Sequence, residues 1–151
     1  MIRTEREHRA SLEYRDALRT DRERAVAVPG LDDLAREWAV GGIDRALAMV
    51  EEELAEYEGL LAGTRAITPL RTLDDIPTAL VQARIAVGWT QRDLARRLGV
   101  SVQAVNRDEL GGYTTATLSR LSQVAAVLGI QLEGFCRFPT RSSAPELRAS
   151  D

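Results

Sequence analysis

The most informative side chains are polar residues at helical spacing near the middle of the chain. Gln103 and Arg107 are four residues apart and Asn106 lies between them, so a helix would place all three on one face. A Gln or Asn amide can form two hydrogen bonds with adenine, and an arginine guanidinium can form two with guanine. Val102 could contact a thymine methyl group. Together they would give a helix the polar, uncluttered outer face that entry into the major groove of DNA requires.

Two short helices are expected to position these side chains. Thr90 is a residue type that caps helix N-termini, and the helix that follows it should end at Gly99. Ser101 should cap a second helix from Val102 to about Leu110. A small core between the two helices would consist of Leu94, Ala95, Leu98, Val100 and Val105. The sequence therefore predicts a helix-turn-helix, whose second helix enters the major groove.

Residues 74–129 resemble the XRE family of helix-turn-helix regulators, which have the lambda-repressor-like fold. The resemblance depends on a combination of positions: Arg84-Ile85, Gly88, Thr90-Gln91, Leu94-Ala95, Leu98-Gly99-Val100-Ser101, Val105, Glu109, Leu118, Leu121, Ala125 and Leu128-Gly129. It implies that Gln91 contacts a backbone phosphate and that the second helix contacts bases. The candidate DNA-binding residues are thus Thr90, Gln91, Ser101, Val102, Gln103, Asn106 and Arg107.

The same resemblance assigns a structural role to one pair of charged residues. It also shows one position at which this sequence departs from the family pattern. Arg84 and Glu109 match a buried or semi-buried ion pair of the family, and removal of either partner would leave an uncompensated charge. The loop 110–115 lacks the basic residue that the family often has there. We therefore expect weaker anchoring to the DNA backbone.

The segment before this domain is predicted to be helical. Residues 3–27 favour a charged helix, with residues 1–10 solvated or frayed, and residues 31–38 favour a short helix that ends at Gly41-Gly42. A heptad seam then follows: Ile43, Leu47, Val50, Leu54, Tyr57 and Leu61. The seam could bind a second subunit or a partner protein, or it could pack on the N-terminal helices of its own chain. Trp38 and Trp89 are expected to be core anchors.

The remaining elements complete an all-α architecture with one strand. Asp74 or Asp75 should cap a helix to about Val87, and Thr114 or Thr115 should cap a last helix that ends at Gly129. Residues 130–138 favour a short C-terminal strand, and residues 139–151 a disordered tail. The predicted units are a helical segment 1–63, a helix-turn-helix domain 74–138 and the tail.

Composition excludes several classes of protein. The chain has a net charge of −3, and all 20 basic residues are arginine. Residues 31–63 carry two Arg and nine Asp or Glu, which gives a net charge of −7. Residues 64–112 carry seven Arg and five Asp or Glu, which gives a net charge of +2. One cysteine, Cys136, and one histidine, His8, give no disulfide framework or zinc cluster. We expect no metal, no cofactor, no enzyme activity and no membrane segment, in a cytoplasmic protein.

The order of segments also resembles HigA-type antitoxins, which bind a toxin and repress their shared operon. That resemblance implies an autoregulating repressor that binds a double-stranded DNA operator as a homodimer and holds a toxin or other protein partner through its N-terminal helices. The alternative is an interaction module that bridges proteins and has a helix-turn-helix fold but does not bind DNA by itself. Gln103 and Arg107 favour DNA binding, because a module freed from DNA would need neither.

Overall fold

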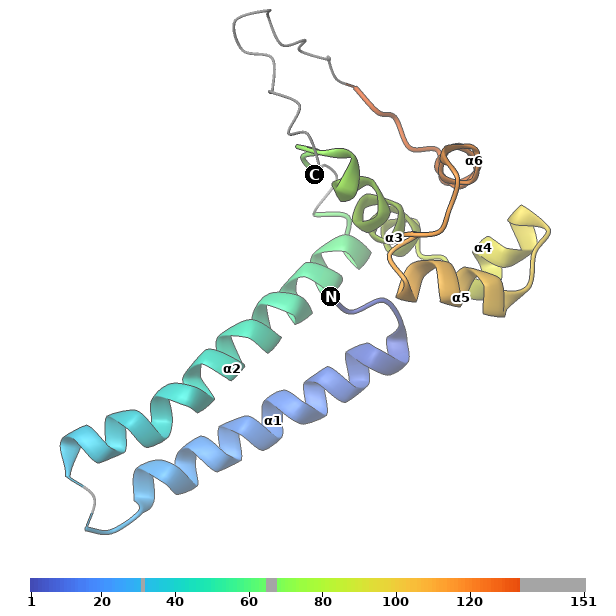
Figure 1. Cartoon of the computed structure of the whole chain (residues 1–151). Coiled ribbons are helices and arrows are strands. Elements are labelled where there is room, and N and C mark those ends of the chain that lie inside the picture. Colours follow the sequence, from blue (N-terminus) through green and yellow to red (C-terminus); the bar gives the residue numbers. More distant parts are fainter. Residues whose placement is uncertain (31, 65–67, 134–151) are drawn as a thin grey trace, which may run out of the picture.

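A computed structural model describes residues 1–30, 32–64 and 68–133 of the chain. Within these ranges the chain is helical, as expected for the all-α class (Figure 1). The elements are α1 (Glu5–Ala27), α2 (Asp33–Leu61), the 3-10 helix η1 (Leu73–Asp75), α3 (Ile76–Ala86), α4 (Gln91–Leu98), α5 (Val102–Leu110) and α6 (Leu118–Leu128). Figure 1 shows α1 and α2 as a long hairpin that projects from a cluster of the four shorter α-helices.

The predicted heptad seam faces α1 of the same chain. Val50, Leu54 and Tyr57 are buried in the core, and Ile43 and Leu47 are partly buried. Leu61 is exposed and the adjacent Leu60 is buried instead, so the last position of the seam was misassigned by one residue. Of the two roles left open for the seam, the structure supports packing on its own N-terminal helix and does not support a subunit contact.

The predicted break at Gly41-Gly42 is wrong, because α2 runs through both residues without interruption. A glycine inside a helix costs about 1 kcal/mol relative to alanine, and packing of a helix on a neighbour can outweigh that cost. Ion pairs between α1 and α2 contribute to this packing on the C-terminal side of the glycines, namely Arg22 with Asp44 at 2.5 Å and Arg19 with Glu51 at 2.7 Å. Trp38 is 78% exposed, so its expected role as a core anchor is also wrong.

The extreme N-terminus is docked on the molecule and is not frayed as predicted. Ile2 is 3% exposed and belongs to the same hydrophobic cluster as Leu54, Leu80 and Leu94. Thr4 caps α1 by accepting a hydrogen bond from the Glu7 backbone N–H at 3.2 Å. The apolar residue and the cap together fix where α1 begins, and residues of the hairpin join the core of the helix-turn-helix. The boundary proposed at residue 63 stays a prediction.

Helices α3 to α6 surround the other part of this core. Its most deeply buried side chains are Leu80, Val81, Leu94, Val105 and Val124. Thr117 caps α6, in place of the predicted Thr114 or Thr115. Residues 111–115 form a turn in which the Thr114 hydroxyl donates to the Gly111 carbonyl at 3.0 Å, so the helix begins later than expected. Gly129, with a φ of +70°, ends α6 as predicted.

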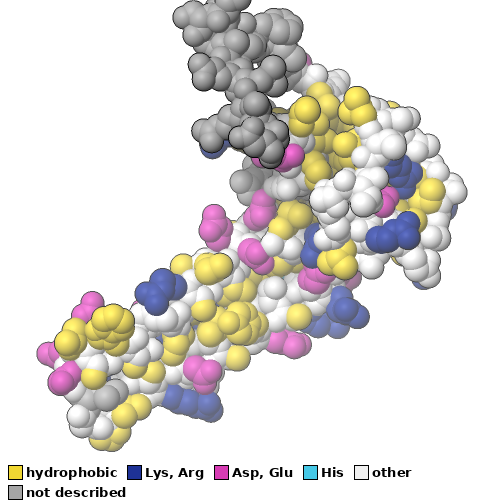
Figure 2. All heavy atoms as spheres, in the orientation of Figure 1, with side chains coloured by type: hydrophobic (Ala, Val, Ile, Leu, Met, Phe, Trp, Pro, Cys, Tyr) yellow, Lys and Arg dark blue, Asp and Glu magenta, His cyan; other side chains and the backbone are white. Residues whose placement is uncertain are grey.

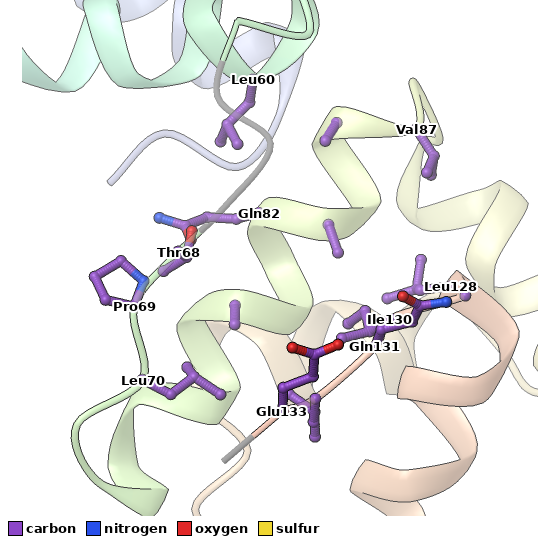
Figure 3. Close-up of a pocket in the computed structure, with 15 residues that line it drawn as sticks. Leu60, Thr68, Pro69, Leu70, Gln82, Val87, Leu128, Ile130, Gln131 and Glu133 are labelled. Atoms are coloured by element: carbon purple, nitrogen blue, oxygen red, sulfur yellow. The ribbon is translucent and has the colours of Figure 1, made fainter.

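The C-terminal side of the domain differs from the prediction. Residues 130–133 form no strand, and the rest of the predicted strand and the tail, residues 134–151, lie outside the described residues. A cavity of about 670 Å³ lies between α3 and the segments 68–70 and 130–133 (Figure 3). Leu60, Leu70 and Leu128 line it, and none of its lining residues belongs to α4 or α5. No helix in the described part of the chain is long and apolar enough to cross a membrane.

Candidate nucleic-acid interface

Helix α4 begins and ends at the residues that the sequence predicts. The Thr90 hydroxyl accepts from the Asp93 backbone N–H at 3.2 Å, and the Asp93 carboxylate accepts from the Thr90 backbone N–H at 3.0 Å. This reciprocal capping box satisfies two backbone donors at the helix start. Gly99 has a φ of +68°, a left-handed conformation that favours glycine, and it turns the chain toward α5.

Helix α5 presents a polar face to solvent. The Ser101 hydroxyl accepts from the Ala104 backbone N–H at 3.1 Å and fixes the helix start. Val105 and Glu109, four residues apart, are buried and hold the inner face against the core. The outer face consists of exposed residues, which include all the proposed base-contacting positions: Ser101, Val102, Gln103, Asn106, Arg107 and Leu110. The fold therefore brings the candidate base-contacting residues together on one accessible surface.

Most acidic side chains near this surface are already engaged. Asp93 pairs with Arg96 at 3.1 Å, and Asp108 pairs with Arg120 at 3.3 Å. The Thr90 hydroxyl and backbone N–H hold the pKa of Asp93 below its ordinary value, so this carboxylate stays ionised within its cap. The Arg107 side chain has no ion pair or hydrogen bond among the described residues. Its guanidinium is thus available to an external acceptor.

A buried hydrogen-bond network supports the inner side of α5. The Arg84 guanidinium donates to both carboxylate oxygens of Glu109, at 2.5 and 2.8 Å. It also donates to the backbone carbonyls of Trp89 and Arg3, both at 2.8 Å. The predicted ion pair is therefore present, and it connects α3, α5, the start of α4 and the N-terminal segment.

Besides the Ser101 hydroxyl, which caps α5, two other candidate DNA-binding side chains are already bonded within the chain. The Thr90 hydroxyl donates to Asp93 at 2.6 Å, and the Gln91 side-chain amide donates to Glu109 at 2.9 Å. Their proposed phosphate contacts would have to use the remaining hydrogen-bonding capacity of these groups. The assignment of all seven DNA-binding residues stays a prediction.

Sequence reasoning missed three supporting contacts of the site. The Arg3 guanidinium donates to the Glu109 backbone carbonyl at 3.2 Å, a contact between residues 106 positions apart. The guanidinium of Arg97 lies 3.7 Å from the ring centroid of the partly buried Trp89. Tyr113, in the turn after α5, is buried in the core, and this burial raises the pKa of its hydroxyl. The sequence signal for this tight turn was the pair Gly111-Gly112, which directly precedes Tyr113.

Comparison with known proteins also identifies a helix-turn-helix in this part of the chain. Residues 80–135 match the helix-turn-helix family model, which is that of XRE-type regulators, over a little more than a third of the chain. This part of the chain is a helix-turn-helix domain, and it contains α4, the turn at Gly99 and α5. No curated protein and no solved structure matched the chain. The described residues contain no group of three or more potential metal ligands.

Proposed function

We propose that the protein is a sequence-specific regulator of transcription that inserts α5 into the major groove of double-stranded DNA. The observation that carries this proposal is the outer face of α5, where Gln103, Asn106 and Arg107 are exposed within a helix-turn-helix domain. Docking of the second helix in the groove places its N-terminal residues against base edges. The proposal involves no catalytic step and no cofactor.

We further propose that it represses its own operon, as antitoxins of the HigA type do. The acidic hairpin of α1 and α2 supports a second binding activity, because a surface of that charge repels phosphate and suits a protein partner. A toxin held by this hairpin would leave α5 free for DNA. Such a repressor would act in the cytoplasm, on an operator bound by two subunits.

One observation favours a second candidate, a bridging module that does not bind DNA alone. The turn that follows α5 carries no basic residue, and residues 64–112 have a net charge of only +2. Phosphate contacts supply most of the non-specific affinity of DNA-binding proteins. A weak phosphate contribution would make the isolated protein a poor DNA binder unless a partner or a second subunit assists it.

Fluorescence anisotropy with the DNA just upstream of the protein's own gene distinguishes the two candidates. A shuffled duplex of the same composition is the control, and both duplexes are titrated at two salt concentrations. Binding to the upstream duplex alone, weakened by salt, is the expected result. Equal weak binding to both duplexes, or none, would contradict autoregulation by this protein alone and favour the bridging module.

A further inference from the structure

The outer surface of α2 carries a second apolar stripe that the hairpin itself does not use. Leu34, Trp38 and Met49 are 64%, 78% and 71% exposed. At 3.6 residues per turn they lie on one side of α2, opposite the buried seam that faces α1. Figure 2 shows hydrophobic side chains gathered near the far end of the hairpin, away from the helix-turn-helix domain. Single exposed apolar residues are ordinary, but a stripe of large ones marks an interaction surface.

Two opposite charges lie on the same stripe, one on each side of Met49. Arg45 and Glu52 are exposed, and neither side chain has an ion pair or hydrogen bond among the described residues. They are seven residues apart, which is two helical turns, or about 10 Å along the axis. Neighbouring side chains on a helix are three or four residues apart, so Arg45 and Glu52 cannot pair within one helix.

Glu52 is unusual among the acidic residues around it. Glu51 pairs with Arg19 at 2.7 Å, Glu53 with the N-terminal amine, and Glu58 with His8 at 2.9 Å. Glu56 accepts a hydrogen bond from Gln82 at 2.6 Å. Within the described ranges, Glu52 is the member of this acidic run that has no partner in its own chain. The Glu52 carboxylate is thus available to a positive charge on another molecule.

We propose that this stripe is the contact between two copies of the chain, packed antiparallel along α2. A two-fold axis near residues 48–49 would place Arg45 of each copy opposite Glu52 of the other, with the two Met49 side chains at the axis. Such an isologous contact must be self-complementary, and the order of positive, apolar and negative side chains meets that requirement. The same register places Trp38, seven residues before Arg45, level with Gly59, seven residues after Glu52, so the largest side chain faces the smallest.

The register also sets the separation of the two helix-turn-helix domains. The C-terminal ends of the two α2 helices, at Leu61, would be 25 residues apart along the bundle, which is about 38 Å. This distance is comparable to the roughly 34 Å between half-sites one helical turn apart on DNA. That consequence rests on the proposed function, whereas the contact between the copies does not.

Sedimentation equilibrium of the full chain without DNA tests the proposal. Wild-type protein is expected to dimerise, and Arg45→Glu and Glu52→Arg are each expected to raise the dimer dissociation constant by about tenfold or more, because like charges then face each other. The double variant, with the charges exchanged, should dimerise nearly as well as wild type. Trp38→Ala should abolish dimerisation, whereas Tyr14→Ala, on the exposed face of α1, should not.

Three results would overturn the proposal: a wild-type chain that stays monomeric, a double variant no stronger than the single ones, or a Trp38→Ala variant that dimerises normally. Circular dichroism of each variant establishes that it is folded, which is expected because the substituted residues are exposed. Because the sedimentation experiment contains no DNA, its result does not depend on whether the proposed DNA-binding function is correct. A dimer that fails to bind DNA contradicts the proposed function only, and a monomer that binds DNA contradicts the dimer only.

Discussion

Arg84 of α3 and Glu109 of α5 form a two-pronged ion pair in the interior, and their side chains are only 3% and 0% exposed. The same guanidinium donates to the backbone carbonyl of Arg3, and the Arg3 side chain returns a hydrogen bond to the Glu109 carbonyl. The orientation of α5, which carries the candidate base-contacting residues, is therefore coupled to the first residues of the chain.

Substitution Glu109→Gln should destabilise the fold strongly. It leaves the buried Arg84 charge without a counter-ion, and loss of one partner of a buried pair costs about 3–5 kcal/mol. Urea denaturation followed by circular dichroism measures this loss. Glu5→Gln is the control, because the Glu5–Arg9 pair on α1 is exposed and should contribute less than about 1 kcal/mol. A loss as small as that of the control would contradict the role given to Glu109.

Substitution Ile2→Ala should weaken the helix-turn-helix core, although Ile2 is far from it in sequence. Truncation of a buried isoleucine costs about 2–5 kcal/mol. Thermal and urea unfolding of the full chain measure the effect, with Val28→Ala at an exposed position as the control. If Ile2→Ala unfolded at the same urea concentration as wild type, the N-terminus would not be packed on the core as described.

The capping box of α4 should make stability depend on pH in the acid range. Hydrogen bonds from Thr90 lower the pKa of Asp93 from its ordinary value of 3.8. A carboxylate with a lowered pKa in the folded state stabilises the fold above its unfolded pKa, and this contribution is lost as the pH falls through the lowered value. Asp93→Asn should therefore reduce the dependence of the urea midpoint on pH below about pH 4.

Urea titrations of wild type and Asp93→Asn at several acidic pH values make the comparison. Asp21→Asn, on the exposed surface of α1, is the control substitution. An unchanged pH profile in the Asp93 variant would show that the capping carboxylate does not contribute to acid stability.

Local signals explain why much of the domain could be predicted from the sequence. Thr90, Ser101, Gly99 and Gly129 act through hydrogen bonds or backbone conformations within a few residues of themselves, and the structure has each of them in its predicted role. The exposed face of α5 follows from helical spacing once the buried positions Val105 and Glu109 are known. Short-range chemistry was therefore sufficient to predict the ends of α4 and α5 and the C-terminal end of α6.

The errors occurred where contacts between distant segments decide the structure. Gly41-Gly42 has a strong local tendency to break a helix, but packing against α1 maintains it. Ile2 becomes a core residue only because the hairpin returns the N-terminus to α3, which no local pattern indicates. Trp38 is expected in the core as part of the apolar face of a short helix, and its exposure becomes apparent only when the seam is placed against α1.

The most direct test of the central claim, that α5 contacts base edges, is the effect of Arg107→Ala on specific and shuffled duplexes. Loss of one bidentate base contact should cost about 1–3 kcal/mol on the operator and relax the preference at one position per half-site. Arg24→Ala, on exposed α1, should leave binding unchanged. Binding to the shuffled duplex should change little in the Arg107 variant. An equal loss of binding free energy on both duplexes would contradict the claim and would indicate that Arg107 contacts a phosphate and not a base.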